Sequence, residues 1–383
     1  MRIKNGLKEG DYMNPIYLDN AASTPVHPRV LVKFTEVAEK LYGNPSSQHS
    51  AGLQAKAEIE NAKDIIAKRL SCNTENIFFT SGATMSNNIL IQGMIRKHPE
   101  TMFITSNVEH NDIMELYNWL PYSKRLVTID ENGIVNLEQL DNLIKACKEV
   151  GMYSLVSVQM ANSETGIIQP VGKISEIVHQ HDKAFFHCDA TQYIPYYPVD
   201  IDKIGIDALS MSGQKIGGIK GSGILYARQE FVDELLPIIF GEQGLIGGTP
   251  STPLISSLGE AFNLLEYGSL DVAHKRDFLL DELENLGGKL VGTIDNRLPN
   301  NIYIRFPGIK GLTLMNLLND YNIYIGTGSA CSTDSDRASH VALAYGLTEE
   351  EAHECVRFTL SKYNSYTELE YVIKVLKSIL SLL

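Results

Sequence analysis

The feature that most constrains the fold is a row of short apolar runs that alternate with stretches of helical periodicity, from about residue 76 to residue 227. The runs are rich in β-branched and aromatic residues and are too short to be ordinary helices, so each is predicted to be a strand. They occupy residues 77–80, 102–105, 126–129, 153–158 and 184–187. This alternation favours an α/β domain with a mainly parallel sheet covered by helices on both faces.

The order of predicted strands and helices changes near residue 265. A charged helical stretch at 271–286 precedes a strand at 301–306, a further helix, a Gly/Ser-rich loop and a terminal helix at 368–382. This order favours a smaller α+β unit, which we expect the N-terminal segment to join. The predicted domains are residues 24–264 and residues 265–383 with 14–23.

Charge and cysteine content narrow the classes of function. Lys and Arg total 33 against 46 Asp and Glu, a formal charge of −13, which argues against a protein that binds nucleic-acid phosphates. The sequence shows neither a secretory signal nor an apolar run long enough to span a membrane, so we expect a cytoplasmic protein. Its five scattered cysteines lack CxxC spacing, which disfavours a disulfide scaffold and a metal site.

Function in a parallel α/β domain usually lies at the carboxyl ends of the strands. After the strand at 77–80 comes a turn of small residues at 81–84 that opens a helix. Its backbone N–H groups and the Thr84 hydroxyl are suited to a phosphate. The alternative is an ordinary helix N-cap at Ser81 or Thr84.

Two further strand ends carry charged residues. Asp189 follows an apolar strand, where a carboxylate is costly unless a positive group, such as a protonated heterocyclic nitrogen, pairs with it. Lys215 follows the run at 206–210, where an amine can be freed for Schiff-base chemistry. A solvated carboxylate and a surface lysine are the alternatives. Together with the turn, the two residues predict a site that holds pyridoxal phosphate at three points.

The sequence resembles the group I cysteine desulfurases, fold-type I pyridoxal-phosphate enzymes related to the class V aminotransferases. The resembling segments are residues 17–25, 43–47, 81–84, 109–110, 162–166, 187–192, 212–215, 328–331 and 357–361. The resemblance implies a large domain with a mainly parallel, seven-stranded type of sheet and a small α+β domain. It also implies removal of sulfur from L-cysteine, which gives L-alanine and a persulfide on Cys331 for transfer to an acceptor protein.

The resemblance further implies how the matching residues would hold the cofactor. Lys215 would bind it covalently, Asp189 would hold the ring nitrogen, and Gln192 would donate to the ring oxygen. His110 would stack on the ring and assist proton transfer. The phosphate contacts would come from Gly82, Ala83, Thr84 and Ser212.

For the substrate, the resemblance implies that Asn162 would contact both the ring oxygen and the amino acid. Arg357 would clamp the substrate carboxylate with its two-pronged donor set, which lysine does not reproduce. Cys331 lies among small polar residues at 326–336, a composition typical of an exposed loop. Such a loop cysteine distinguishes a desulfurase from an aminotransferase, whereas the other four cysteines lie in or beside helix- and strand-forming stretches and are predicted to be buried.

Three departures from the family pattern stand out. Gln214 replaces a histidine that normally contacts the phosphate, and it carries no charge. The segment 240–250 is shorter than expected and lacks the family's arginines, although Thr249 remains where a neighbouring subunit usually contributes a phosphate contact. We therefore expect a homodimer. Met85 replaces an acidic residue after the phosphate turn.

Two alternatives to an active desulfurase stay open. One is a non-catalytic family member that serves as a scaffold or binding subunit, and the other is a selenocysteine lyase or aminotransferase-like relative. The retained set Lys215, Asp189, His110, Arg357 and Cys331 favours the desulfurase. The sulfur acceptor is open between an iron–sulfur cluster assembly scaffold, a thiolation enzyme for tRNA or DNA and a small carrier protein.

Overall fold

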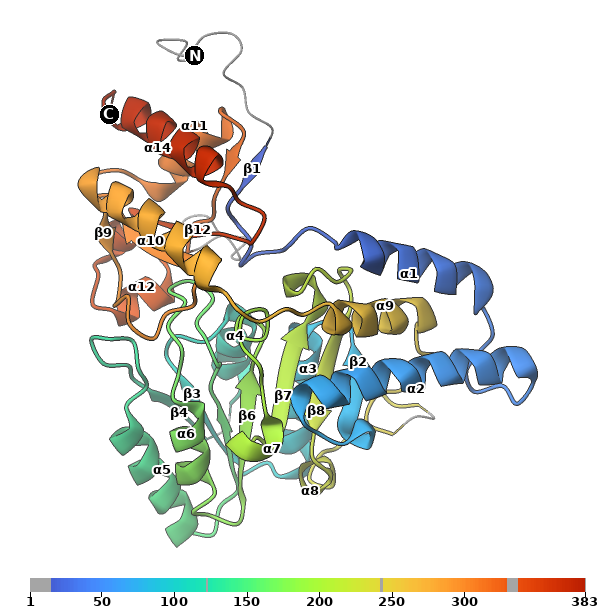
Figure 1. Ribbon diagram of the computed structural model, residues 1–383. Helices are drawn as coiled ribbons and strands as arrows, with labels where there is room; N and C mark the ends of the chain where they lie inside the picture. Colours follow the sequence, from blue (N-terminus) through green and yellow to red (C-terminus); the bar gives the residue numbers. More distant parts are fainter. Residues whose placement is uncertain (1–14, 122, 242–243, 329–336, 383) are drawn as a thin grey trace.

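The computed structural model describes residues 15–121, 123–241, 244–328 and 337–382. Its centre is a seven-stranded sheet in the order β2-β8-β7-β6-β5-β3-β4 (Figure 1). All neighbouring pairs are parallel except the two that involve β8, which confirms the mainly parallel sheet. The strands are β2 (Ile77–Thr80), β3 (Met102–Ser106), β4 (Lys124–Val127), β5 (Ser154–Ser157), β6 (Ala184–Asp189), β7 (Ala208–Ser212) and β8 (Gly223–Ala227).

Helices cover both faces of this sheet. Successive residues of a strand point to opposite faces, so Phe185 packs in one apolar cluster with α3 and α4, whereas Phe186 packs in another with α2, α5, α6 and α9. Burial on both sides explains why the strands read as continuous apolar runs. The helices of this part are α1 (Pro28–Lys40), α2 (Ser50–Leu70), α3 (Ala83–Lys97), α4 (Asn111–Trp119), α5 (Leu137–Glu149), α6 (Val171–Val178), α7 (Ile201–Ile204), α8 (Gln229–Val232) and α9 (Thr252–Asn263).

The C-terminal elements build a separate apolar cluster, which Ile16 and Leu18 of the N-terminal segment join. β1 pairs in parallel with β11, and β10 lies between β12 and β9. In Figure 1 these elements lie together above the carboxyl ends of the large sheet. They are β1 (Ile16–Tyr17), α10 (Leu270–Asn285), β9 (Lys289–Leu290), β10 (Asn301–Arg305), α11 (Gly311–Asn319), β11 (Ile323–Tyr324), α12 (His340–Ala344), α13 (Glu349–His353), β12 (Cys355–Thr359) and α14 (Tyr366–Leu380).

The edge strand β4 begins two residues earlier than its apolar run predicts, because it includes Lys124 and Arg125. An edge strand has one open side, so it tolerates charged residues that a central strand excludes. The Lys124 ammonium also donates to the carbonyls of Tyr117, Asn118 and Leu120 at the end of α4, where a cation is favoured. Across the described ranges, no helix has the length and apolarity needed to cross a bilayer.

A buried ionic cluster ties together the end of the sheet opposite the predicted site. The fully buried Asp207 carboxylate accepts from the Phe186 N–H at 2.6 Å and pairs with Arg228 at 2.6 Å. It also lies 3.1 Å from Nε2 of His179, which follows α6. This hydrogen bond to Asp207 raises the pKa of His179, although burial opposes the shift.

We expect His179→Gln to destabilise the fold more at pH 6 than at pH 9. Because the folded-state pKa of His179 is raised, its protonated form stabilises the fold below the unfolded value of about 6.5, and this contribution disappears as pH rises through the folded value. The side chain is 31% exposed, so the contribution at pH 6 is about 1 kcal/mol, or about 1–2 °C in the thermal midpoint of a chain of this length. Thermal melts of this variant and of the exposed-site control His274→Gln check it. Equal losses at both pH values would contradict it.

Candidate active site

The carboxyl ends of the central strands open onto a cavity of about 180 Å³. Its wall combines the start of α3, the ends of β6 and β7, the N-terminal segment and β12. The structure therefore brings together most of the residues that the sequence predicted. The lining residues are Ala21, Ala22, Ala83, Thr84, His110, Asp112, Gln159, Ala161, Ser163, Asp189, Thr191, Gln192, Ser212, Gln214, Lys215 and Arg357.

The predicted phosphate turn forms the first turn of α3. Gly82 has a φ of +148°, which favours glycine, and a Cβ there would lie 3.2 Å from the Ser212 hydroxyl. Gly82 is also the N-cap, without a side-chain capping bond, so the structure does not support the alternative of a cap by Ser81 or Thr84. The Ser212 hydroxyl accepts from the Ala83 N–H at 2.8 Å. A helix N-terminus beside a hydroxyl suits an anion such as a phosphate.

Asp189 ends β6 and is 8% exposed. Its carboxylate accepts from the Thr191 N–H at 2.9 Å and from the Asn87 amide at 3.5 Å, and no ion pair to it is present among the described residues. Burial, together with the negative charge of Asp112, raises the pKa of Asp189. A cation bound against this carboxylate would restore its charged form, since an opposite charge favours ionisation.

Lys215 lies in a short 3₁₀ turn (Gly213–Lys215) directly after β7. Its ammonium donates to the Ala22 carbonyl at 2.5 Å, and its side chain lines the cavity, so Lys215 is not a surface lysine. The N-terminal segment is held against this turn because both the N–H and the hydroxyl of Thr24 donate to the Gln214 carbonyl, at 2.9 and 2.8 Å. The Gln192 amide donates to the Ala21 carbonyl at 3.0 Å.

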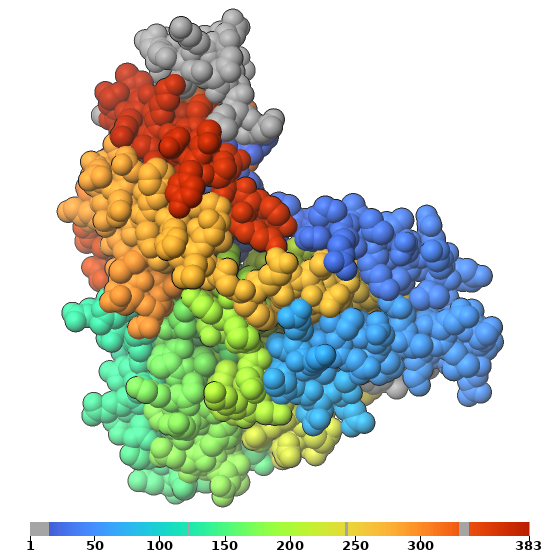
Figure 2. All heavy atoms as spheres, in the orientation of Figure 1, coloured from blue at the N-terminus to red at the C-terminus, as the bar shows by residue number. Residues whose placement is uncertain are grey.

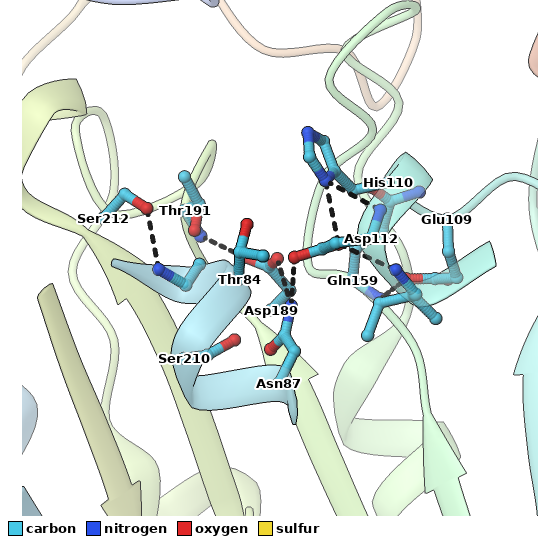
Figure 3. Close-up of polar contacts among 12 residues, drawn as sticks. Thr84, Asn87, Glu109, His110, Asp112, Gln159, Asp189, Thr191, Ser210 and Ser212 are labelled. Carbon is cyan, nitrogen blue, oxygen red and sulfur yellow. Dashed lines mark hydrogen bonds and ion pairs between the residues drawn. The ribbon is translucent and has the colours of Figure 1, made fainter. Parts of the chain in front are cut away.

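His110 precedes α4 and points toward the cavity, whereas the neighbouring Glu109 turns away from it (Figure 3). The Glu109 carboxylate accepts from the Ser106 hydroxyl and from the Gln159 N–H. Burial raises the pKa of Glu109 to about 8. Glu109 therefore braces β3 against the segment after β5 and is not the acidic partner of His110. That partner is Asp112, whose Oδ1 lies 2.8 Å from Nδ1 of His110.

Arg357 of β12 brings a buried guanidinium to the cavity from the C-terminal elements. It pairs with Asp19 at 2.8 Å and donates to the Ser163 carbonyl at 2.9 Å. Its Nε is buried without a hydrogen-bond partner among the described residues. A buried unpaired donor is costly, so this wall of the cavity is suited to an anionic group.

Four predicted site residues are not among the described residues that line this cavity. Gly82 lies directly before the lining residue Ala83, as the N-cap of α3. The Asn162 amide donates to the Val108 carbonyl at 2.7 Å, and its oxygen accepts from Glu164 and Thr165, so the side chain is committed to local backbone. Thr249 lines a separate cavity of about 630 Å³, which adjoins the phosphate turn at Ser81. The larger cavity is not the candidate site, because the predicted amine and carboxylate line the smaller one. Cys331 lies outside the described residues.

The sequence did not predict the polar lining residues Asp112, Gln159, Ser163 and Thr191, nor the buried Asn87. Asn87 lies on α3, is fully buried, and donates from one amide nitrogen toward Asp112 at 3.1 Å and Asp189 at 3.5 Å. The sequence spacing could have indicated Asn87, because it falls one helical turn after Ala83 and therefore on the same face of α3. Asp112 lies in the first turn of α4, where an acidic residue is also expected merely from the helix dipole.

Comparisons with known proteins agree with this geometry. The sequence model of the aminotransferase class-V family matches residues 16–372. A mitochondrial cysteine desulfurase of Eremothecium gossypii is 36% identical over 94% of this chain and 75% of that protein. The cysteine desulfurase IscS of Dictyoglomus turgidum is 34% identical over 95% of this chain and 94% of that protein.

Solved structures show the same relationship. A NifS-like protein superposes with a TM-score of 0.89 at 33% identity, and the alignment covers 97% of this chain and 100% of that one. A structure described as SspA in complex with cysteine superposes with a TM-score of 0.80 at 31% identity, covering 91% and 100%. The chain therefore belongs to the aminotransferase class-V family and, within it, to the cysteine desulfurases.

Proposed function

We propose that this protein removes sulfur from L-cysteine, releases L-alanine and leaves a persulfide on Cys331 for transfer to an acceptor protein. The observation that carries the proposal is a single cavity lined by the amine of Lys215, the carboxylate of Asp189 and the guanidinium of Arg357. An amine, an anion for a cationic ring and a carboxylate clamp are the groups that pyridoxal-phosphate chemistry on an amino acid needs, and Cys331 would add the sulfur acceptor.

The test is direct. Purified protein is incubated with L-cysteine and a thiol reductant, with and without added pyridoxal phosphate, and alanine and sulfide are measured. We expect equal amounts of both products, and more of each when the cofactor is added. Absence of alanine in the presence of the cofactor would overturn the proposal.

The residues present fit pyridoxal phosphate, the cofactor on which this family depends. Asp189 is a buried carboxylate without an ion pair among the described residues, as a cationic ring nitrogen requires. The first turn of α3 and Ser212 form an anion cradle that a Cβ at Gly82 would crowd. Lys215 would hold the cofactor covalently, and Ala83, Thr84 and Ser212 would take its phosphate. When bound, the cofactor supplies an electron-withdrawing ring that stabilises negative charge on the substrate Cα.

The chain's own residues then bind the substrate and move its protons. Arg357 holds the amino acid by its carboxylate, with the planar fork that fixes orientation as well as charge. The Lys215 amine takes the Cα proton and returns it during turnover, and His110 assists this transfer. Asp189 keeps its negative charge against the ring nitrogen. Cys331 would accept the sulfur as a thiolate nucleophile.

We also propose that the active form is a homodimer in which Thr249 completes the site of the other subunit. Two observations support this proposal. The large cavity that Thr249 lines adjoins the phosphate turn. The helices α1 and α2 project from the body as an arm (Figure 2), and their apolar side chains Leu31, Val32 and Leu53 are each more than half exposed. A second copy would bury these side chains, whose exposure is otherwise unfavourable.

We expect Thr249→Ala to weaken cofactor retention by about 1.5–3 kcal/mol, the cost of one hydrogen bond to a charged group. Gln214→His, which adds a possible charge in the cavity, should recover part of this loss. The dissociation constant for pyridoxal phosphate is measured for each variant and for the control Ser251→Ala, an exposed hydroxyl of the same segment. Unchanged affinity in Thr249→Ala, or a monomer that retains its cofactor fully in sedimentation, would contradict the composite site.

A further inference from the structure

The cavity contains a second carboxylate, Asp112, whose side chain is 9% exposed and to which the mechanism above gives no role. Its Oδ1 lies 2.8 Å from Nδ1 of His110, and its Oδ2 accepts from the Asn87 amide at 3.1 Å. The same amide nitrogen reaches toward Asp189. Figure 3 shows these side chains in one continuous row, from the histidine ring through Asp112 and Asn87 to the end of β6.

We propose that Asp112 is the positioning residue of His110: it holds a proton on Nδ1 and thereby leaves Nε2 as the nitrogen that exchanges protons in the cavity. This inference rests on the proposed function, in which His110 assists proton transfer. A carboxylate on one ring nitrogen fixes the tautomer and the orientation of an imidazole, and it makes the other nitrogen more basic.

The distances decide which nitrogen carries the proton. Nδ1 of His110 has two contacts with Asp112, one with Oδ1 at 2.8 Å and one with the backbone N–H at 3.4 Å. These contacts require opposite protonation of Nδ1, because the carboxylate accepts and the N–H donates. The contact at 2.8 Å has the length of a charge-assisted hydrogen bond, whereas 3.4 Å lies beyond the usual range. Nδ1 therefore carries the proton.

Asp112 is suited to this role because its surroundings keep it ionised. Burial by itself would raise its pKa, but the hydrogen bond and charge of His110, with hydrogen bonds from Thr84 and Asn87, outweigh burial and lower it. The pKa of Asp189 moves in the opposite direction, through burial and the charge of Asp112. Of the two carboxylates, Asp112 is thus the more readily ionised in the absence of a bound cation.

The other charged groups around His110 do not replace Asp112. Asp189 of β6 is separated from Asp112 by the Asn87 amide. Lys215 after β7 and Arg357 of β12 line the same cavity as cations. A cation near His110 disfavours its protonated form, whereas the Asp112 carboxylate favours it. Asp112 therefore opposes the effect of both cations.

Two further ionisable neighbours in the described part of the chain, Glu109 and His340, are bound by other groups. The Glu109 carboxylate is bound by the Ser106 hydroxyl and the Gln159 N–H on the far side of the chain. His340 of α12 lies 2.8 Å, by its Nε2, from the Glu109 carbonyl. Among the described residues, Asp112 is therefore the carboxylate in hydrogen-bond contact with His110.

The test compares Asp112→Asn with Glu115→Gln, which removes one negative charge from an exposed position on the same helix. Both proteins and the wild type are reconstituted with pyridoxal phosphate and labelled with ¹⁵N-histidine, and the His110 signals are assigned with His110→Gln. The tautomer and titration of the ring are read from the nitrogen shifts, and kcat/KM for L-cysteine is measured against pH.

In the wild type we expect Nδ1 to be protonated and Nε2 to titrate. Asp112→Asn removes an anion from the imidazolium, so the titration midpoint of His110 should fall by about one unit. The acidic limb of kcat/KM should move to lower pH with it. Glu115→Gln should leave both at their wild-type positions. If Asp112→Asn does not fold, Asp112→Ser removes the same charge and gives the same comparison.

The inference would be overturned if His110 kept its wild-type titration midpoint and tautomer in Asp112→Asn. An equal shift of the midpoint in Glu115→Gln would also overturn it. The nitrogen shifts need no turnover, so they separate this inference from the proposed function. A shifted His110 in a protein that releases no alanine from L-cysteine would uphold the positioning role and reject the desulfurase.

Discussion

Lys215→Ala is expected to lower alanine release from L-cysteine by about 10²–10⁴-fold, the range that follows removal of one positioned acid–base group. The visible absorbance of the bound cofactor should disappear with it, because only a lysine amine can hold the cofactor covalently. The fold should persist, since Lys215 follows β7 in a short turn at the edge of the cavity and its ammonium donates to the Ala22 carbonyl, a contact that lies outside the apolar clusters.

Lys220→Ala is the matched control, because Lys220 follows on the same segment but is exposed. It should keep both the absorbance and the activity. Circular dichroism of the two variants separates loss of chemistry from loss of fold. A Lys215→Ala protein that still released alanine at a rate near that of the wild type would remove Lys215 from the proposed mechanism.

Much of the large sheet could be predicted because its strands are buried on both faces. Ile77–Thr80 matches its apolar run, and β6 extends the run at 184–187 only by Cys188 and Asp189. The prediction for the edge strand β4 was displaced along the chain by two residues. The pairing of β4 with β3 depends on backbone partners and not on apolar side chains. Strand β8 was not predicted as a separate strand, and its antiparallel direction follows from the path of the chain.

The three anchor points of the site could be predicted for a similar reason. Parallel strands end at one edge of the sheet, so the residues after β6 and β7 meet there without further information. Asp189 and Lys215 duly line one cavity with the start of α3. Their roles toward a cofactor remain predictions, which the variants above test.

The sequence pattern could not predict the contacts between helices. The acidic residue next to His110 in sequence is Glu109, but the residue that contacts its ring is Asp112. Which carboxylate reaches the ring depends on where α4 begins and on the packing of α3, which brings Asn87 to Asp112. Both features depend on tertiary packing. The same applies to Asn162, whose local backbone bonds were not visible in the motif around it.

The four cysteines that the structure describes are poor candidates for accepting sulfur. Burial raises the pKa of Cys72 and of Cys355 to about 12. It also raises the pKa values of Cys147 and Cys188. The attacking species is the thiolate, and such thiols are protonated near pH 7. Of the five cysteines in the chain, Cys331 is the one that these shifts do not exclude.

Cys331→Ser should therefore form no persulfide and release little alanine, while the cofactor remains bound. L-Cysteine should still perturb the visible spectrum of this variant, because Lys215, Asp189 and Arg357 are unchanged. Mass spectrometry of the protein after brief exposure to L-cysteine measures the persulfide. Cys72→Ser is the control, since Cys72 is the most exposed of the described cysteines, and it should keep the wild-type yield. A normal yield in Cys331→Ser would move the accepting role to another cysteine, whose local environment would then have to open for its thiolate to form.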